Sequence, residues 1–161
     1  MLENINLRKI PKEQRTYSLC LKAVEVNKMN LMEQFDFTGH VPVADIPKYT
    51  YIADGLIACL SKSELLDCTL PAKIFSYYAA GRPMVLAMNG EIQQIIADSK
   101  SGYIVDAEDY NGFADAICKL YLLKEEERVS MGKSAKEYYY NYFEHDINMS
   151  KLEQFISNES I

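Results

Sequence analysis

Hydrophobic and polar positions follow two different periods along the chain. Three runs of consecutive apolar residues have the pattern of strands buried on both faces: GLIACL (55–60), MVLAM (84–88) and GYIVD (102–106). FDFT (35–38) predicts a further short strand. Apolar residues spaced three or four apart predict helices over 13–28, 46–54, 71–80, 91–99, 109–123 and 125–143, with a terminal helix within 146–161. This alternation predicts an α/β, Rossmann-like domain over 1–161, a parallel sheet with helices on both faces.

Composition narrows the class of protein. With 161 residues, 48% of them hydrophobic, the chain can bury the core of one domain. Its net charge of −6 argues against a nucleic-acid surface, which needs clustered Lys and Arg. The apolar runs are far shorter than the roughly 20 residues of a membrane-spanning helix, so no membrane span is predicted.

The cysteines favour a reducing compartment. Cys20, Cys59, Cys68 and Cys118 form no CxxC pair, and only two histidines accompany them, so no metal site is predicted. Cys59 and Cys118 lie in apolar segments and are predicted to be core thiols. This pattern is typical of a cytoplasmic protein.

The segment TLPAKIFSYYAAGRPMV (69–85) is the strongest candidate for chemistry. Ligands of parallel sheets bind beyond the carboxyl ends of the strands, and the connection 61–70 is longer than usual there. Pro71 opens the next helix, whose first free amides, at Ala72 and Lys73, favour an anion together with the lysine charge. An ordinary capped helix in an α/β core explains the same residues, and both interpretations stay open.

Five segments, in order, resemble the carboxyl-terminal, donor-nucleotide-binding domain of a GT-B glycosyltransferase of group 1, family 4. They are FTGHVP (37–42), IPKYTYIADGLIACL (46–60), LPAKIFSYYAAGRPMV (70–85), GEIQQIIADSKSGYIVDAED (90–109) and MGKSAKEYYYNYF (131–143). Their order and spacing, rather than any one motif, carry the resemblance.

The resemblance implies a binding site for a nucleotide diphosphate sugar, with a UDP-sugar as the default donor. It implies no metal, because helix dipole and basic groups stabilise the phosphates. It does not indicate a catalytic residue. The implied contacts are Gly39 and His40 at the base, Leu70, Pro71, Ala72 and Lys73 at the phosphates, Ser76 at the ribose position, and Asn89, Gly90 and Glu91 near the sugar. As alternatives, His40 is a polar loop residue and Glu91 helps to start a helix.

Three departures from the family pattern bear on this site. In the family a glutamate accepts hydrogen bonds from the ribose; here that position is Ser76, which is too short for the same contact. A second glutamate, present in many members eight residues earlier, corresponds to Cys68. Glu64 or Asp67 could compensate, although a solvated loop explains them equally. The first strands and the amino-terminal acceptor domain have no counterpart, so we expect the chain alone to be inactive.

The implied function is that of the donor-binding domain of an enzyme that transfers sugar to a glycan or lipid-linked acceptor in polysaccharide biosynthesis. The alternative is a non-catalytic α/β interaction domain with a decayed nucleotide site, paired with an amino-terminal partner or with itself as a homodimer. The aromatic run 138–143 either packs on its own sheet or meets such a partner. A flavodoxin-like signalling domain is a weaker option, since only Asp36 could contribute to its acidic cluster.

Overall fold

The computed structural model describes residue 26 and residues 28–158, which divide between two compact units, Met1–Ile46 and Pro47–Ile161. Most of the predicted helix 13–28, with Cys20, lies outside the described residues. The described residues of the first unit form two 3-10 turns, η3 (Met32–Gln34) and η4 (Val43–Asp45). The predicted strand 35–38 is wrong, since these residues join no sheet. Instead the rings of Phe35 and Phe37 stack, with centroids 5.9 Å apart.

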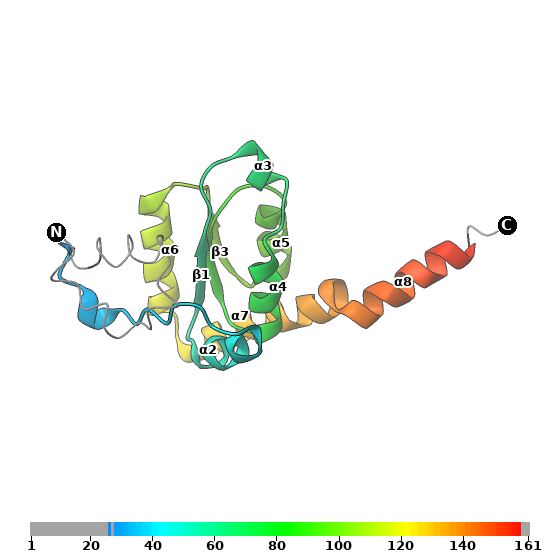
Figure 1. Cartoon of the computed structure of the whole chain (residues 1–161), viewed down its shortest axis with the longest axis horizontal. Coiled ribbons are helices and arrows are strands. Elements are labelled where there is room, and N and C mark those ends of the chain that lie inside the picture. Colours follow the sequence, from blue (N-terminus) through cyan, green and yellow to red (C-terminus); the bar gives the residue numbers. More distant parts are fainter. Residues whose placement is uncertain (1–25, 27, 159–161) are drawn as a thin grey trace. The chain divides into compact units, whose positions relative to one another are not determined.

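The second unit is built on a three-stranded parallel sheet, which confirms the Rossmann-like α/β prediction. The strands lie in the order β1 (Leu56–Cys59), β2 (Met84–Ala87) and β3 (Gly102–Val105). Leu56 is in register with Met84, and Met84 with Gly102. All three carboxyl ends therefore meet at one edge of the sheet (Figure 1).

Helices account for most of the remaining chain. They are α2 (Ile46–Ile52), α3 (Glu64–Asp67), α4 (Ala72–Ala80), α5 (Ile92–Ser99), α6 (Tyr110–Leu122), α7 (Glu125–Tyr138), the π-helical turn η5 (Tyr139–Phe143) and α8 (His145–Asn158). Gly81 ends α4 in the left-handed conformation, with φ 64°, where a side chain would be strained. The helical region predicted over 125–143 is confirmed, as α7 continued by the π-helical turn η5, and His145 is exposed at the start of α8.

Each face of the sheet has its own apolar layer. Leu56, Met84 and Leu86 pack on one face in a cluster that includes residues of α4 and α5. Val85 points to the other face and packs with Ala116 and Leu120 of α6. Figure 1 shows α4 and α5 on one side of the strands and α6 on the other.

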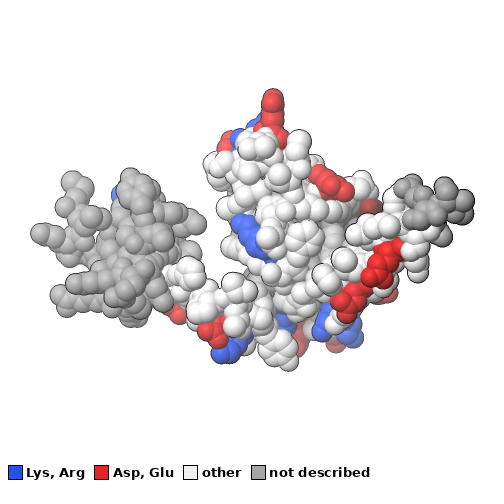
Figure 2. Space-filling view, turned by 45° about the vertical axis from the view of Figure 1, so that its right-hand side comes forward, with Lys and Arg blue, Asp and Glu red and all other residues white. Residues whose placement is uncertain are grey.

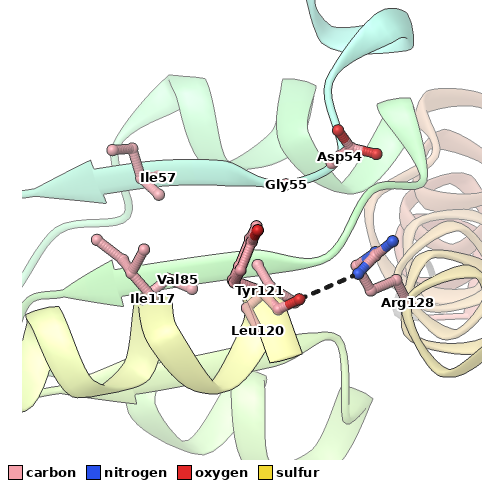
Figure 3. Close-up of a pocket in the computed structure, with 8 residues that line it drawn as sticks. All are labelled: Asp54, Gly55, Ile57, Val85, Ile117, Leu120, Tyr121 and Arg128. Carbon is pink, nitrogen blue, oxygen red and sulfur yellow. Dashed lines mark hydrogen bonds between the residues drawn. The ribbon is translucent and has the colours of Figure 1, made fainter. Parts of the chain in front are cut away.

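Strand β1 is buried on one face only, contrary to the prediction of burial on both faces. Leu56 and Ala58 are buried, whereas Ile57 is 54% exposed and Cys59 is exposed. The reason is topological, because β1 is an edge strand and the layer formed by α6 centres on Val85 of the middle strand. A groove of about 260 Å³ remains beside β1, with Ile57 on one side of it and Ile117 of α6 on the other (Figure 3).

The thiols at Cys59 and Cys118 are exposed, so their prediction as core residues is wrong. Cys59 alternates with the buried positions of β1 and points to its uncovered face. Cys118 is exposed on α6, two residues after the buried Ala116. An apolar sequence context did not distinguish the inner side of these elements from the outer side.

A buried hydroxyl cluster joins α4, α5 and the start of β3. The Tyr78 hydroxyl lies 2.8 Å from the Ser99 hydroxyl and 3.1 Å from that of Ser101, and the two serine oxygens are 2.7 Å apart. All three residues are buried. Because each hydroxyl both donates and accepts, the triad satisfies its polar atoms within the core.

The aromatic run 138–143, at the end of α7 and in η5, packs largely on this core. The ring of Tyr78 lies 5.5 Å from that of Tyr138 and 5.4 Å from that of Phe143, between centroids. Tyr139 also contacts the buried cluster, whereas Tyr140 and Tyr142 are exposed. Packing on the chain's own core is therefore confirmed for three of these rings.

We predict that Tyr78→Phe lowers the free energy of unfolding by about 1 kcal/mol, because it removes one member of a buried hydrogen-bonded triad. Burial raises the pKa of Tyr78 above its ordinary value of 10.0, and the bonds to Ser101 and Ser99 lower it only in part. Since the folded pKa exceeds the unfolded one, this contribution is complete below pH 10.0 and is lost as the pH rises through the folded pKa.

Urea unfolding on both sides of pH 10.0 checks the prediction. The native chain should lose stability with rising pH more steeply than Tyr78→Phe. Tyr121→Phe, at a side chain that is 80% exposed, is the control and should behave like the native chain. Equal slopes for native chain and Tyr78→Phe would contradict the assignment.

Candidate functional site

The loops at the carboxyl ends of the strands are tied together by hydrogen bonds. The backbone N–H of Lys62, after β1, donates to the carboxylate of Glu108, after β3, at 3.1 Å. The N–H of Ala107 donates to the side-chain oxygen of Asn89, after β2, at 3.0 Å. Bonds that join all three loops fix the shape of this edge.

Gly90 brings the loop after β2 against the long connection after β1. Its φ is 93°, a conformation that side chains rarely adopt. A β-carbon at this position would overlap the backbone carbonyl of Asp67, at the end of α3. Only glycine therefore permits both the conformation and the close approach.

The start of α4 lies at the same edge. Pro71 is its N-cap, with extended backbone at φ −61° and ψ 134°, so the helix begins at Ala72, one residue later than predicted. The N–H of Ile74 donates to the carbonyl of Pro71 at 2.9 Å, which leaves the amides of Ala72 and Lys73 before the first helical bond. The helix dipole and the exposed Lys73 ammonium both favour an anion here.

The position expected at the ribose lies further along the same helix. Ser76 is exposed, three residues after Lys73, and so lies on the same side of α4. Cys68, the companion position, is exposed in the connection before the helix. Neither side chain supplies a carboxylate, and the nearby acidic groups of this connection are Glu64 and Asp67 of α3.

The structure brings most of the predicted contacts to one edge of one unit. These are Leu70, Pro71, Ala72 and Lys73 around the start of α4, and Asn89, Gly90 and Glu91 between β2 and α5. Glu91 is exposed and is the N-cap of α5, as the alternative interpretation expected. Gly39 and His40 belong to the first unit, which is described by itself.

A pocket of about 290 Å³ opens at this edge and was missed by the sequence analysis. Its lining combines the ends of two strands with the turn into α6: Cys59, Leu60, Ser61, Ala87, Glu108, Asp109, Tyr110 and Phe113. The available signal was the acidic and aromatic run AEDYNGF directly after β3. Asp109 is committed to capping, because its carboxylate accepts from the N–H of Gly112 at 2.9 Å. Glu108 and the two rings thus border a mainly apolar space that would suit a flat ring.

The part of the chain that the structure describes offers neither a metal site nor a membrane-spanning helix. No cluster of three or more His, Cys, Asp or Glu side chains there is arranged to hold a metal ion. None of the helices in those residues has the length and apolar content to cross a membrane.

A family model described as glycosyl transferases group 1 matches residues 12–122. A GDP-mannose-dependent alpha-(1-6)-phosphatidylinositol monomannoside mannosyltransferase of Mycobacterium tuberculosis is 26% identical over 125 residues, which are 76% of this chain and 32% of that protein. A D-inositol 3-phosphate glycosyltransferase of Corynebacterium urealyticum is 34% identical over 64 residues, 40% of this chain and 15% of the relative. The chain thus spans about a third or less of these proteins. No solved structure matches it.

We predict that Gly90→Ala lowers the free energy of unfolding by about 1–3 kcal/mol, because the new β-carbon is strained and meets the Asp67 carbonyl. Urea unfolding measures the loss, and amide NMR shifts at Asp67 and Cys68 report the displaced connection. Ser61→Ala, at an exposed position of the same connection, is the control and should change stability little. Native-like stability of Gly90→Ala would mean that the two loops do not approach as closely as described.

Proposed function

Because this chain belongs to the group 1 glycosyltransferases, we propose that it is the nucleotide-sugar-binding domain of such an enzyme. The proposed reaction transfers a sugar from a nucleotide diphosphate sugar to a glycan or a lipid-linked acceptor, in polysaccharide biosynthesis. The family membership rests on the match over residues 12–122, more than half of the chain.

One structural observation carries the site assignment, namely the position of the α4 start at the carboxyl edge of the parallel sheet. Free helix amides, a helix dipole and the Lys73 ammonium converge there, and all three stabilise a diphosphate. The missed pocket at the same edge offers Tyr110 and Phe113 for the base. In this assignment Asn89, Gly90 and Glu91 face the donor sugar.

The donor base has two candidates. The family resemblance implies a UDP-sugar as the default donor, whereas the mycobacterial relative is named as dependent on GDP-mannose. That name also specifies a phosphatidylinositol-based acceptor, which supports a lipid-linked class. We therefore propose a uridine or guanosine diphosphate sugar, and the binding experiments below compare both.

The complete enzyme requires more than this chain in our proposal. The matched segments cover only 32% and 15% of the two relatives, and we propose that an amino-terminal domain supplies the acceptor site. We also propose a cytoplasmic location, because the described cysteines Cys59, Cys68 and Cys118 are free thiols, as is usual in reducing compartments.

A second candidate function follows from the ribose position. Ser76 and Cys68 replace the two carboxylates of the family pattern, which favours a domain that kept its fold and associates with a partner or with itself. A folded chain that binds neither UDP nor GDP would support this candidate over the first.

We predict that Lys73→Ala weakens binding of the preferred nucleotide diphosphate about ten- to hundredfold, because one charge-assisted contact to phosphate is lost. Calorimetric titration of the chain with UDP and with GDP measures the effect. The control is Lys119→Ala, which removes an equal charge from an exposed position on α6. Equal weakening in both variants would show a general charge effect and would contradict the site.

We further predict that Ser76→Glu strengthens binding of the same nucleotide about tenfold, since a carboxylate there can accept hydrogen bonds from both ribose hydroxyls. Comparison with the 2′,3′-dideoxy nucleotide tests the contact, because the gain should vanish without those hydroxyls. Ser130→Glu, at an exposed position on α7, adds the same charge elsewhere and should bring no gain. A gain that persists with the dideoxy nucleotide would reject the ribose assignment.

A further inference from the structure

A second, polar groove lies at the opposite, amino-terminal ends of the strands. Its volume is about 270 Å³, and its walls come from the turn after α4, the chain before β1 and one side of α7. Four basic side chains line it, Arg82, Arg128, Lys133 and Lys136, against two acidic ones, Asp54 and Glu125. Figure 2 shows basic groups on the lower side of the molecule, where Figure 1 draws α2 and α7.

The two arginines are held in place by the ends of neighbouring helices. Arg128 donates through one terminal nitrogen to the carbonyl of Leu123, just after α6, at 2.7 Å. The same nitrogen donates to the carbonyl of Tyr121, near the end of α6, at 3.4 Å (Figure 3). Arg82 donates to the carbonyl of Tyr51 in α2, and its guanidinium lies 5.3 Å from the centre of that ring. A guanidinium carries five N–H donors, so each arginine retains donors beyond these bonds.

Lys133 and Lys136 are basic groups of the groove for which the described residues provide no ion-pair partner. Lys133 and Lys136 are three residues apart on α7 and lie on the same side of it. Within the described residues neither ammonium forms an ion pair, with Asp54 and Glu125 included. The Cβ and Cδ atoms of Lys136 lie beside Gly81, which also lines the groove.

We propose that this groove binds a phosphate-bearing ligand at a site separate from the donor nucleotide. Guanidinium groups fixed by helix ends provide oriented donors, and the two free ammonium groups provide mobile charge, the combination that phosphate oxygens prefer. The phosphate belongs either to a soluble metabolite or to a lipid headgroup. The proposal does not depend on the proposed transferase function, because the groove lies at the other end of the strands from Lys73.

The test follows backbone amides of the whole chain by NMR during titration with inorganic phosphate and pyrophosphate at constant ionic strength. Gly81 and Gly132 line the groove and serve as reporters. A second arm measures sedimentation of the chain with phosphatidylglycerol vesicles, with phosphatidylcholine vesicles as reference. The test variant carries both Lys133→Gln and Lys136→Gln. Glutamine keeps the first side-chain carbons of residue 136 beside Gly81 and removes the positive charge. Lys119→Gln, on α6, is the control that removes a positive charge elsewhere. Lys73→Ala is included to separate the donor site.

Saturable shifts of both glycine amides, weakened about tenfold in the double variant and unchanged in Lys119→Gln and Lys73→Ala, would establish a soluble phosphate ligand. Vesicle binding that needs phosphatidylglycerol and is lost in the double variant would instead establish a lipid headgroup. The proposal is overturned if neither probe binds, if chloride produces the same shifts, or if the double variant binds as the native chain does. Shifts confined to Ala72–Ile74 would place the anion at the donor site and would equally overturn it.

Discussion

The buried hydroxyl of Tyr78 is the interaction on which the second unit depends. It lies within hydrogen-bond distance of Ser99 at the end of α5 and of Ser101 before β3, while its ring packs against Tyr138 at the end of α7 and Phe143 of η5. One side chain of α4 therefore contacts α5, the residue before β3, α7 and η5. Because an unpaired hydroxyl in this core would cost about 1–3 kcal/mol, alternative packings of α4 against α5 are disfavoured.

The parallel order of the sheet decides where the surface remains open. Helices α4 and α5, which connect consecutive neighbouring strands, lie on the same face, and α6 lies on the other, where it packs on the middle strand. The second face of β1 is consequently uncovered and leaves the apolar groove beside Ile57. The edge itself is partly protected, because the Tyr77 hydroxyl donates to the outward carbonyl of Ile57 at 3.1 Å.

Local sequence patterns predicted where the strands and helices begin and end better than they predicted which residues of these elements are buried. The three strands of the sheet and the helices after them form at nearly the expected residues, because consecutive apolar residues and helical periodicity are local signals. The same signals could not show that β1 is an edge strand, so Ile57 and Cys59 were misplaced. FDFT lacked a partner strand, and strand propensity alone does not form a sheet. At the site, Lys73 was indicated by helix-start chemistry, whereas Glu108 and Tyr110 depend on how three distant loops meet.

Helix α4 packs into the core with one side and presents residues of the proposed donor site on the other. Ile74 and Tyr78, four residues apart, point into the core and are fully buried, whereas Lys73 and Ser76 lie on the exposed side. A serine at position 76 therefore alters only the exposed side of α4, where the ribose contact is proposed, and leaves the core contacts of Ile74 and Tyr78 in place. The fold can persist whether or not the ribose is recognised, which makes the two candidate functions compatible with one architecture. For the same reason, changes in nucleotide affinity caused by variants at Lys73 or Ser76 report on the site and not on the stability of the sheet.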